Sequence, residues 1–375
     1  TVIGHAERLA PIDAAFVNAT LVNARSEDDF LEKSHAGAVT VPAALAIGET
    51  SGRSGAEVLV SLVAGYEVVG RMYVGGPSML PRFRATGVAG TVGAASTAAR
   101  LLGLDASGIM HALGTAACHG FGQGFLSGTT EVKLNVGMAS RSGVSAALLA
   151  SHGATASPLA FEGDAGYYRA FSNTTEHADL ATKGLGERFL IEETVYKECP
   201  VCIFNQTPIA LAREIAPRID AARIRRVTIR SPELTHTNPG FTVVAPFTTH
   251  LQAVVSARYC TAAALLGRPV ETQACYDTLQ DPEILALCER IDLVMRREDA
   301  ARVDLEVTLD TGETLRAGGI EMDTLRPTNE KVVAKYRRNT AGIPGLDADR
   351  VLETVLGLER LRDVSALTGL LAGTR

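Results

Sequence analysis

The first half of the chain carries apolar residues at helical spacing, interrupted by Gly, Pro, Ser or Asp. From residue 11 to about residue 188, this pattern predicts one helix after another. The clearest helical segments are 39–49, 55–74, 87–102, 106–120 and 131–151. Gly103 suits the end of one helix and Asp105 suits the start of the next. No repeat of fixed period is present, so a solenoid is not favoured. We therefore expect a large all-helical domain over residues 1–195.

The pattern changes after residue 195. Alternating apolar and polar residues predict strands at 223–231 and 302–310, and a hairpin turn at 310–313 leads into a further strand. Two other segments have helical spacing, 253–266 and 282–294. These elements predict an α+β domain over residues 196–340, a usual domain size. Residues 341–375 return to a helical pattern, so the fold class is mainly α with a smaller α+β domain.

Composition narrows the class of protein. With 46% hydrophobic and 21% charged residues, the chain is typical of a soluble globular protein. A net charge of −6 argues against nucleic acid or an acidic membrane as partner, but local arginines and lysines can still bind a small anionic metabolite. There is no apolar run of about 18 residues. The six cysteines lack the spacing of a secreted disulfide scaffold, so we expect a cytoplasmic location.

The segment 131–151 holds the most informative candidate residue. Small residues dominate this predicted helix, which favours close packing against its neighbours. Lys133 lies in its first turn, and buried lysines are rare unless they are paired. Two interpretations stay open from these residues alone. Lys133 extends its ammonium to solvent at a helix end, or it binds a carboxylate or transfers a proton.

Two further segments carry candidate chemistry in the helical half. His35 follows the acidic residues Asp28 and Asp29 and opens an apolar helix, whose dipole would hold the imidazole neutral and ready to accept a proton. The alternative is an acidic surface loop with a capping histidine. Arg84 and Thr86 lie in a loop that runs into a helix start, a suitable anion site, although solvated surface arginines are equally common.

The remaining candidates lie further along the chain. Lys197 precedes a single Cys-x-x-Cys pair that ends at Cys202; zinc would require a second pair, and a redox pair would require a thioredoxin-like context. Lys197 is either a surface residue at a domain hinge or a residue that faces a cleft. Tyr259 lies in a helix of small residues, where a tyrosine hydroxyl is usually a satisfied core group.

Several of these segments, in this order, resemble the MmgE/PrpD family, which includes 2-methylcitrate dehydratase, cis-aconitate decarboxylase and iminodisuccinate epimerase. The Lys133 helix is followed by Ala146-x-x-Leu-Ala-x-x-Gly153 and Phe161-Glu-Gly-x-x-Gly166, which are similar to the core pattern of that family. The resemblance covers essentially the whole chain. It implies an all-helical domain, a smaller α+β domain, and C-terminal helices over 341–375 that pack on the first domain. Family members carry further helices before this N-terminus, so we expect N-terminal residues to be missing here.

The resemblance also implies an activity without a cofactor or metal. We expect proton abstraction next to a carboxylate of a small di- or tricarboxylic acid, with dehydration of the 2-methylcitrate type as the leading reaction. The alternatives are an epimerase of the iminodisuccinate type, a decarboxylase of the cis-aconitate type, or a non-catalytic member that binds a carboxylate metabolite. The family also implies a homodimer.

Candidate site residues follow from the same resemblance. The expected catalytic groups are an acid/base, two cations that bind carboxylate or move a proton, and a hydrogen-bond donor: His35, Lys133, Lys197 and Tyr259. The expected substrate-binding groups are Asp28, Asp29, Arg84, Thr86 and Cys202. Four residues stand where the family carries other polar groups, namely Ser26, Phe30, Arg84 and Cys202. Because the cationic residues persist, a changed substrate explains these departures better than loss of function.

Overall fold

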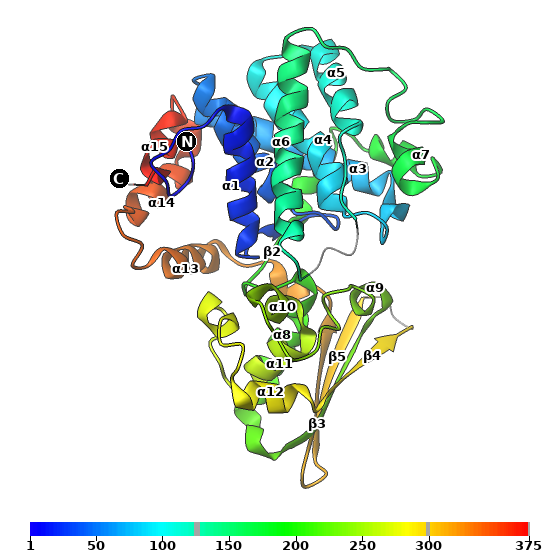
Figure 1. Ribbon diagram of the computed structural model, residues 1–375, viewed down its shortest axis with the longest axis vertical. Coiled ribbons are helices and arrows are strands. Elements are labelled where there is room, and N and C mark those ends of the chain that lie inside the picture. Colours follow the sequence, from blue (N-terminus) through cyan, green and yellow to red (C-terminus); the bar gives the residue numbers. More distant parts are fainter. Residues whose placement is uncertain (124–127, 298–300, 374–375) are drawn as a thin grey trace.

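Six helices build the larger half of the molecule (Figure 1). The computed structural model describes residues 1–123, 128–297 and 301–373. In chain order the six helices are α1 (Pro11–Ala24), α2 (Ala36–Thr50), α3 (Gly55–Val74), α4 (Ala85–Leu102), α5 (Ala106–Ala117) and α6 (Glu131–Ser151). Their positions agree closely with the helices that the apolar spacing predicts. The short helix α7 (Tyr167–Ser172) closes this half.

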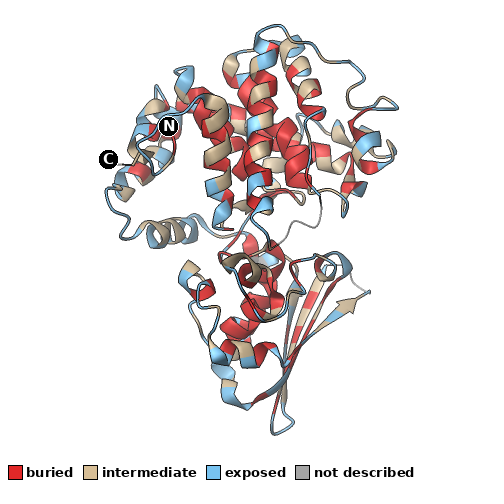
Figure 2. Ribbon diagram, viewed as in Figure 1, coloured by how far each residue is buried: buried red, intermediate tan, exposed pale blue. Residues whose placement is uncertain are grey.

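Small residues allow these helices to pack closely. A Cβ atom at Gly143 of α6 would lie 2.5 Å from the carbonyl oxygen of Thr91 in α4. Nearly every residue of α4 is buried, and Figure 2 shows buried positions concentrated in the centre of this half. The predicted boundary between α4 and α5 is also confirmed. Gly103 ends α4 with a φ of +75°, and the Asp105 carboxylate accepts a hydrogen bond from the Gly108 amide (2.8 Å).

The smaller half is a four-stranded sheet with helices on one face. Its strands, in the spatial order β4-β3-β5-β6, are β3 (Ile224–Pro232), β4 (Ile291–Arg296), β5 (Arg302–Leu309) and β6 (Thr314–Ile320). β4 runs parallel to β3, whereas β5 is antiparallel to both β3 and β6. Alternate residues of β5 are buried, as the predicted two-residue period requires. The helices of this half are α8 (Gln206–Ile215), α9 (Glu233–His236), α10 (His250–Val255), α11 (Ala257–Leu265) and α12 (Pro282–Cys288).

One predicted helix in this half is wrong. The segment 282–294 forms a helix only as far as Cys288, and β4 begins at Ile291. Pairing with β3 decides the conformation of this second part, because Ile291 to Arg296 are in register with Val227 to Pro232. The predicted helix at 253–266 also breaks into two, because Ser256 has an extended backbone and caps α11 through the Tyr259 amide.

The C-terminal segment packs on the helical half. α14 (Ala348–Leu356) and α15 (Ser365–Leu371) contribute Val351 and Leu367 to a core that also contains Ala43 of α2. The Val364 amide donates to the Arg53 carbonyl oxygen (2.8 Å) at the start of α3. A polar helix, α13 (Asn329–Thr340), precedes them and lies beside the junction of the two halves in Figure 1. The apolar pattern gave no signal for α13, because none of its residues is buried.

A minimal two-stranded sheet joins the two halves. β1 (Asp29–Phe30) pairs antiparallel with β2 (Val195–Tyr196), so that Asp29 faces Tyr196 and Phe30 faces Val195. This pairing brings the acidic segment before His35 next to Lys197. Within the described residues, no helix has the length and apolar character needed to span a membrane.

Candidate active site

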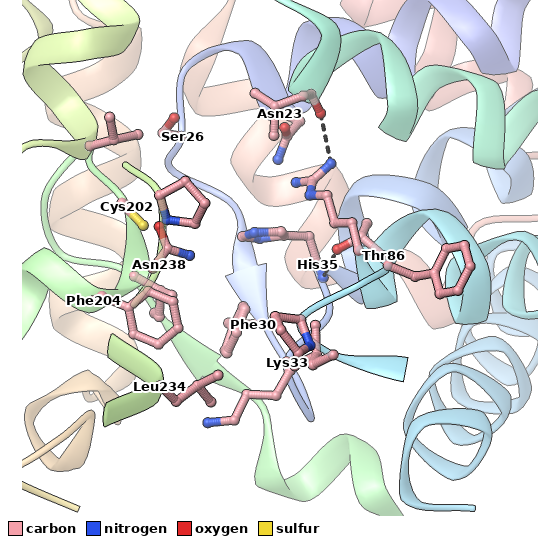
Figure 3. Close-up of a pocket in the computed structure, with 18 of the residues that line it drawn as sticks. Asn23, Ser26, Phe30, Lys33, His35, Thr86, Cys202, Phe204, Leu234 and Asn238 are labelled. Carbon is pink, nitrogen blue, oxygen red and sulfur yellow. Dashed lines mark hydrogen bonds between the residues drawn. The ribbon is translucent and has the colours of Figure 1, made fainter. Parts of the chain in front are cut away.

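A pocket of about 160 Å³ lies where the two halves meet. Figure 3 shows side chains from both halves around it. The helical half supplies one group of lining residues, including His35, Arg84, Thr86 and Lys133, and the smaller half supplies another, including Cys202, Phe204, Leu234 and Asn238. Lys197, next to β2, also lines the pocket. The structure therefore brings together six of the residues predicted from the sequence.

His35 is held in one orientation by two oxygen acceptors. It is the residue immediately before α2, and its Nδ1 lies 2.9 Å from Asp28 Oδ2 and 3.1 Å from the Asp29 carbonyl oxygen. Because both partners only accept hydrogen bonds, Nδ1 must carry the proton. The neutral imidazole then has its lone pair on Nε2. Such a ring is oriented to accept a proton from a ligand.

Burial keeps His35 neutral. Burial lowers the pKa of His35 to about 4, against the opposing effect of Asp28. The sequence suggested the helix dipole as a cause, and the structure adds burial of the imidazole as a cause of the lowered pKa. For Asp28, burial acts to raise the pKa, but His35, Lys197 and Lys133 together hold it well below its usual value. An ionised Asp28 beside a neutral His35 is the result.

Asp28 also fixes Lys197. Lys197 Nζ lies 2.9 Å from Asp28 Oδ1, and both side chains are only 2% exposed. Asn23 Nδ2 donates to the second carboxylate oxygen at 2.6 Å. The Asp28 carboxylate thus interacts with the His35 imidazole, the Lys197 ammonium and the Asn23 side-chain amide at once. It does not line the pocket itself. These contacts position His35 and Lys197.

Lys133 is buried and its ammonium has two neutral partners. Nζ donates to the Asn23 carbonyl oxygen and to Ser26 Oγ, both at 2.7 Å. Burial lowers the pKa of Lys133 to about 7, with Asp28 opposing the shift. The group can therefore carry or release a proton near neutral pH. Ser26, which stands where the family has an acid, binds this lysine and adopts a φ of 55° to do so.

Arg84 and Thr86 flank the base on the other side. Arg84 Nη1 donates to the Val132 carbonyl oxygen (2.7 Å) and to Asn135 Oδ1 (3.3 Å). Burial lowers the pKa of Arg84 to about 10, so it stays cationic at neutral pH. Thr86 Oγ1 accepts a hydrogen bond from the His35 amide (3.1 Å). Thr86 therefore helps to position the start of α2.

Asp29 faces away from the pocket. Its carboxylate accepts hydrogen bonds from the Tyr66 hydroxyl (2.5 Å) and the Gly37 amide (3.0 Å). Burial raises the pKa of Asp29 to about 6. A Cβ atom at Gly37 would lie 2.5 Å from the Tyr66 oxygen, so this contact needs glycine. Asp29 anchors the first turn of α2, and it is not among the residues that line the pocket.

The structure places Tyr259 away from the pocket. It is fully buried in the core of the smaller half, and its hydroxyl lies within hydrogen-bond distance of the carbonyl oxygens of Cys275 (3.0 Å) and Thr278 (2.9 Å). It does not line the pocket. The core interpretation of this tyrosine, which its small-residue helix already suggested, agrees with this placement. Cys202 does line the pocket, and burial raises the pKa of its thiol.

Sequence reasoning missed Lys33, which lines the pocket, and further polar residues near the site. Asn23 binds both Asp28 and Lys133, and Asn238 lines the opposite wall. Lys335 of α13 donates to the carbonyl oxygens of Glu27 (3.0 Å) and Lys197 (2.8 Å). It thereby contacts both main-chain segments that carry the Asp28–Lys197 pair. No spacing rule links these residues to the site. Only the partner of the buried Lys133 could have been sought, since a buried ammonium needs one.

The arrangement is suited to a small polyanion and to proton transfer. The pocket is lined by Lys33, Arg84, Lys133 and Lys197, and among the described residues no Asp or Glu lines it. Cations bind carboxylates through charge-assisted hydrogen bonds, and a neutral imidazole beside them can take a proton.

The fold and this site place the chain in a family of two-domain proteins. Residues 1–179 match the MmgE/PrpD N-terminal domain and residues 199–359 match the MmgE/PrpD C-terminal domain, so the chain belongs to the MmgE/PrpD family. It is 26% identical to cis-aconitate decarboxylase of Homo sapiens, over 98% of this chain and 80% of that protein. It is 24% identical to cis-aconitate decarboxylase of Aspergillus terreus, over 99% of this chain and 83% of that protein.

Proposed function

We propose that this protein is an acid/base lyase that removes a proton next to a carboxylate of a small di- or tricarboxylic acid and eliminates water. One observation carries the proposal: the Asp28–His35 pair, with the imidazole neutral and Nδ1 protonated, faces a pocket lined by cations. A base with a free Nε2 is needed for proton abstraction, and cations stabilise the enolate-like species that follows.

Two different residues carry out the two proton transfers of this reaction. His35 Nε2 takes the proton from the carbon next to the bound carboxylate, which becomes enediolate-like. As the C=C bond forms, the C–O bond breaks and the Lys133 ammonium gives its proton to the leaving hydroxyl. Water departs, and His35 and Lys133 return to their starting states by proton exchange. The pKa values of about 4 and about 7 suit this division of roles.

Decarboxylation is a second candidate, because the relatives named above are cis-aconitate decarboxylases. In that reaction the C–C bond to a carboxylate breaks, CO₂ leaves, and Lys133 protonates the carbon skeleton. The same cations would bind the remaining carboxylates. The neutral base favours elimination of water, since decarboxylation requires an acid but no base.

The test is NMR in D₂O with citrate-like, cis-aconitate-like and succinate-like acids. Incorporation of deuterium and appearance of an alkene without CO₂ would support elimination, and release of CO₂ would support the second candidate. His35→Ala and Lys133→Ala should abolish deuterium incorporation and alkene formation. Lys331→Met, at an exposed position of α13, should leave both unchanged. If folded protein gives neither exchange nor product with any acid, the lyase proposal fails and a non-catalytic carboxylate binder is favoured.

A further inference from the structure

A tight turn immediately before His35 directs a lysine into the pocket. The Leu31 amide donates to the Ser34 carbonyl oxygen and the Ser34 amide donates to that of Leu31, both at 2.8 Å. The two residues between them, Glu32 and Lys33, have φ values of 44° and 63°. Two successive non-glycine residues in this region are unusual and cost conformational energy. The strained turn is therefore maintained by its surroundings, and it sets the direction of the Lys33 side chain.

Lys33 differs from the other cations of the pocket because it has no partner. Lys197 is paired with Asp28, Lys133 with Asn23 and Ser26, and Arg84 with Val132 and Asn135. In the part of the chain that the structure describes, Lys33 makes no hydrogen bond and no ion pair.

The nearby acidic groups do not change this. Glu32 and Glu321 interact with Lys33 only at longer range, and the Glu321 carboxylate is hydrogen-bonded to Thr235. Figure 3 shows the Lys33 side chain extending toward Leu234, away from the imidazole of His35. A free ammonium thus lies at a different part of the pocket from the base.

The charges of the pocket match a trianion. Four cationic side chains line it, and the Asp28 carboxylate behind them neutralises one of them. Three positive charges remain when Lys133 is protonated. The opposite wall contributes Leu234, Thr237 and Asn238 but no charge. A dicarboxylate held at the cations beside His35 would leave Lys33 without a counter-ion.

We propose that Lys33 binds the third carboxylate of a tricarboxylic acid and so selects tricarboxylates over dicarboxylates. This inference rests on the proposed function, because it assigns the substrate class of the same site. Lys33 acts in it as a specificity-determining residue, and proton transfer remains with His35 and Lys133.

Binding, measured without turnover, tests the proposal. Isothermal titration calorimetry at pH 7 would compare propane-1,2,3-tricarboxylate with glutarate, which has the same chain length but lacks the central carboxylate. We expect the unmodified protein to bind the tricarboxylate about 10-fold more tightly or better. Lys33→Met should weaken tricarboxylate binding about 10- to 100-fold and change glutarate binding less than about twofold. Lys33→Arg should retain most of the preference, and Lys331→Met should retain all of it.

The possible results separate the two proposals. Equal affinity for both acids, no binding of the tricarboxylate, or a Lys33→Met variant that weakens both acids alike or neither would overturn the role of Lys33. A selective loss in Lys33→Met, combined with neither deuterium exchange nor product in the unmodified protein, would support the specificity role and reject the lyase. Circular dichroism of each variant confirms that the fold is retained, and the glutarate affinity reports on the rest of the pocket.

Discussion

The two walls of the pocket differ in chemical character. The wall from the helical half carries Lys33, Arg84 and Lys133 together with the imidazole of His35. The wall from the smaller half, apart from Lys197 at the junction, has uncharged residues among those that the structure describes, including Phe204, Leu234 and Asn238. The charged wall rests on closely packed helices in which glycines leave no room for a side chain. In the proposed function the reacting groups therefore lie on the helical half, and the smaller half contributes the uncharged side of the pocket.

The strongest test of this division is removal of the base. His35→Ala should lower kcat about 100- to 10,000-fold, because proton abstraction loses its acceptor. The measurement is the initial rate with whichever acid the NMR panel identifies. His152→Ala, at an exposed position, provides the control and should match the unmodified enzyme. Near-normal activity in His35→Ala would show that another residue is the base.

The second test concerns the acid on the same wall. Because His35 must be neutral and Lys133 protonated, kcat/KM should rise with pH through about 4 and fall again through about 7. Lys133→Arg keeps a cation that does not deprotonate in this range. We expect it to lower kcat about 100-fold and to remove the alkaline fall. An unchanged alkaline limb in Lys133→Arg would exclude Lys133 as the titrating acid.

A smaller effect is expected from α13, the helix that lies beside the junction of the two halves (Figure 1). Lys335→Met removes both hydrogen bonds to the main chain beside Asp28 and Lys197, so kcat should fall about 10-fold with a smaller change in KM. Lys335→Arg should recover part of the loss. A change in KM alone would argue against a role in positioning the Asp28–Lys197 pair.

The uncharged wall should respond mainly through binding. Asn238→Ala removes one polar group that lines the pocket and that, within the described residues, is not a hydrogen-bond partner of His35 or Lys133. We expect KM to rise less than about 10-fold and kcat to stay within about twofold. Steady-state kinetics with the preferred acid measure both. A large loss of kcat would show that this wall takes part in the chemistry.

The smallest effect on activity should come from the interior of the smaller half. Tyr259→Phe should leave kcat and KM unchanged, because the hydroxyl binds two main-chain carbonyl groups in the core. The free energy of unfolding should decrease by about 1 kcal/mol or somewhat more. Chemical denaturation measures the loss. Reduced kcat without reduced stability would support the catalytic role, as a hydrogen-bond donor, that the family resemblance implies for Tyr259.

The sequence predicted the charged wall better than the uncharged one. The helical half follows a strong three-to-four-residue period, and Lys133 is conspicuous because an ammonium interrupts small apolar residues. β4 was missed because its short apolar run fits helix and strand equally well, and only pairing with β3 decides between them. Lys33 and Asn238 escaped notice because no short motif marks them, and their direction depends on a strained turn and on a loop of the other half.

The pairing of β1 with β2 has a mechanical consequence. It holds the loop with Asp28 against the segment with Lys197, and the other Asp28 oxygen orients His35. If the two halves moved apart here to admit or release a ligand, Asp28 would lose Lys197 and its hold on the imidazole would weaken. The open form would then be inactive, and reclosing around the next ligand would restore the base. Opening at this junction would therefore release the ligand and inactivate the base in the same movement.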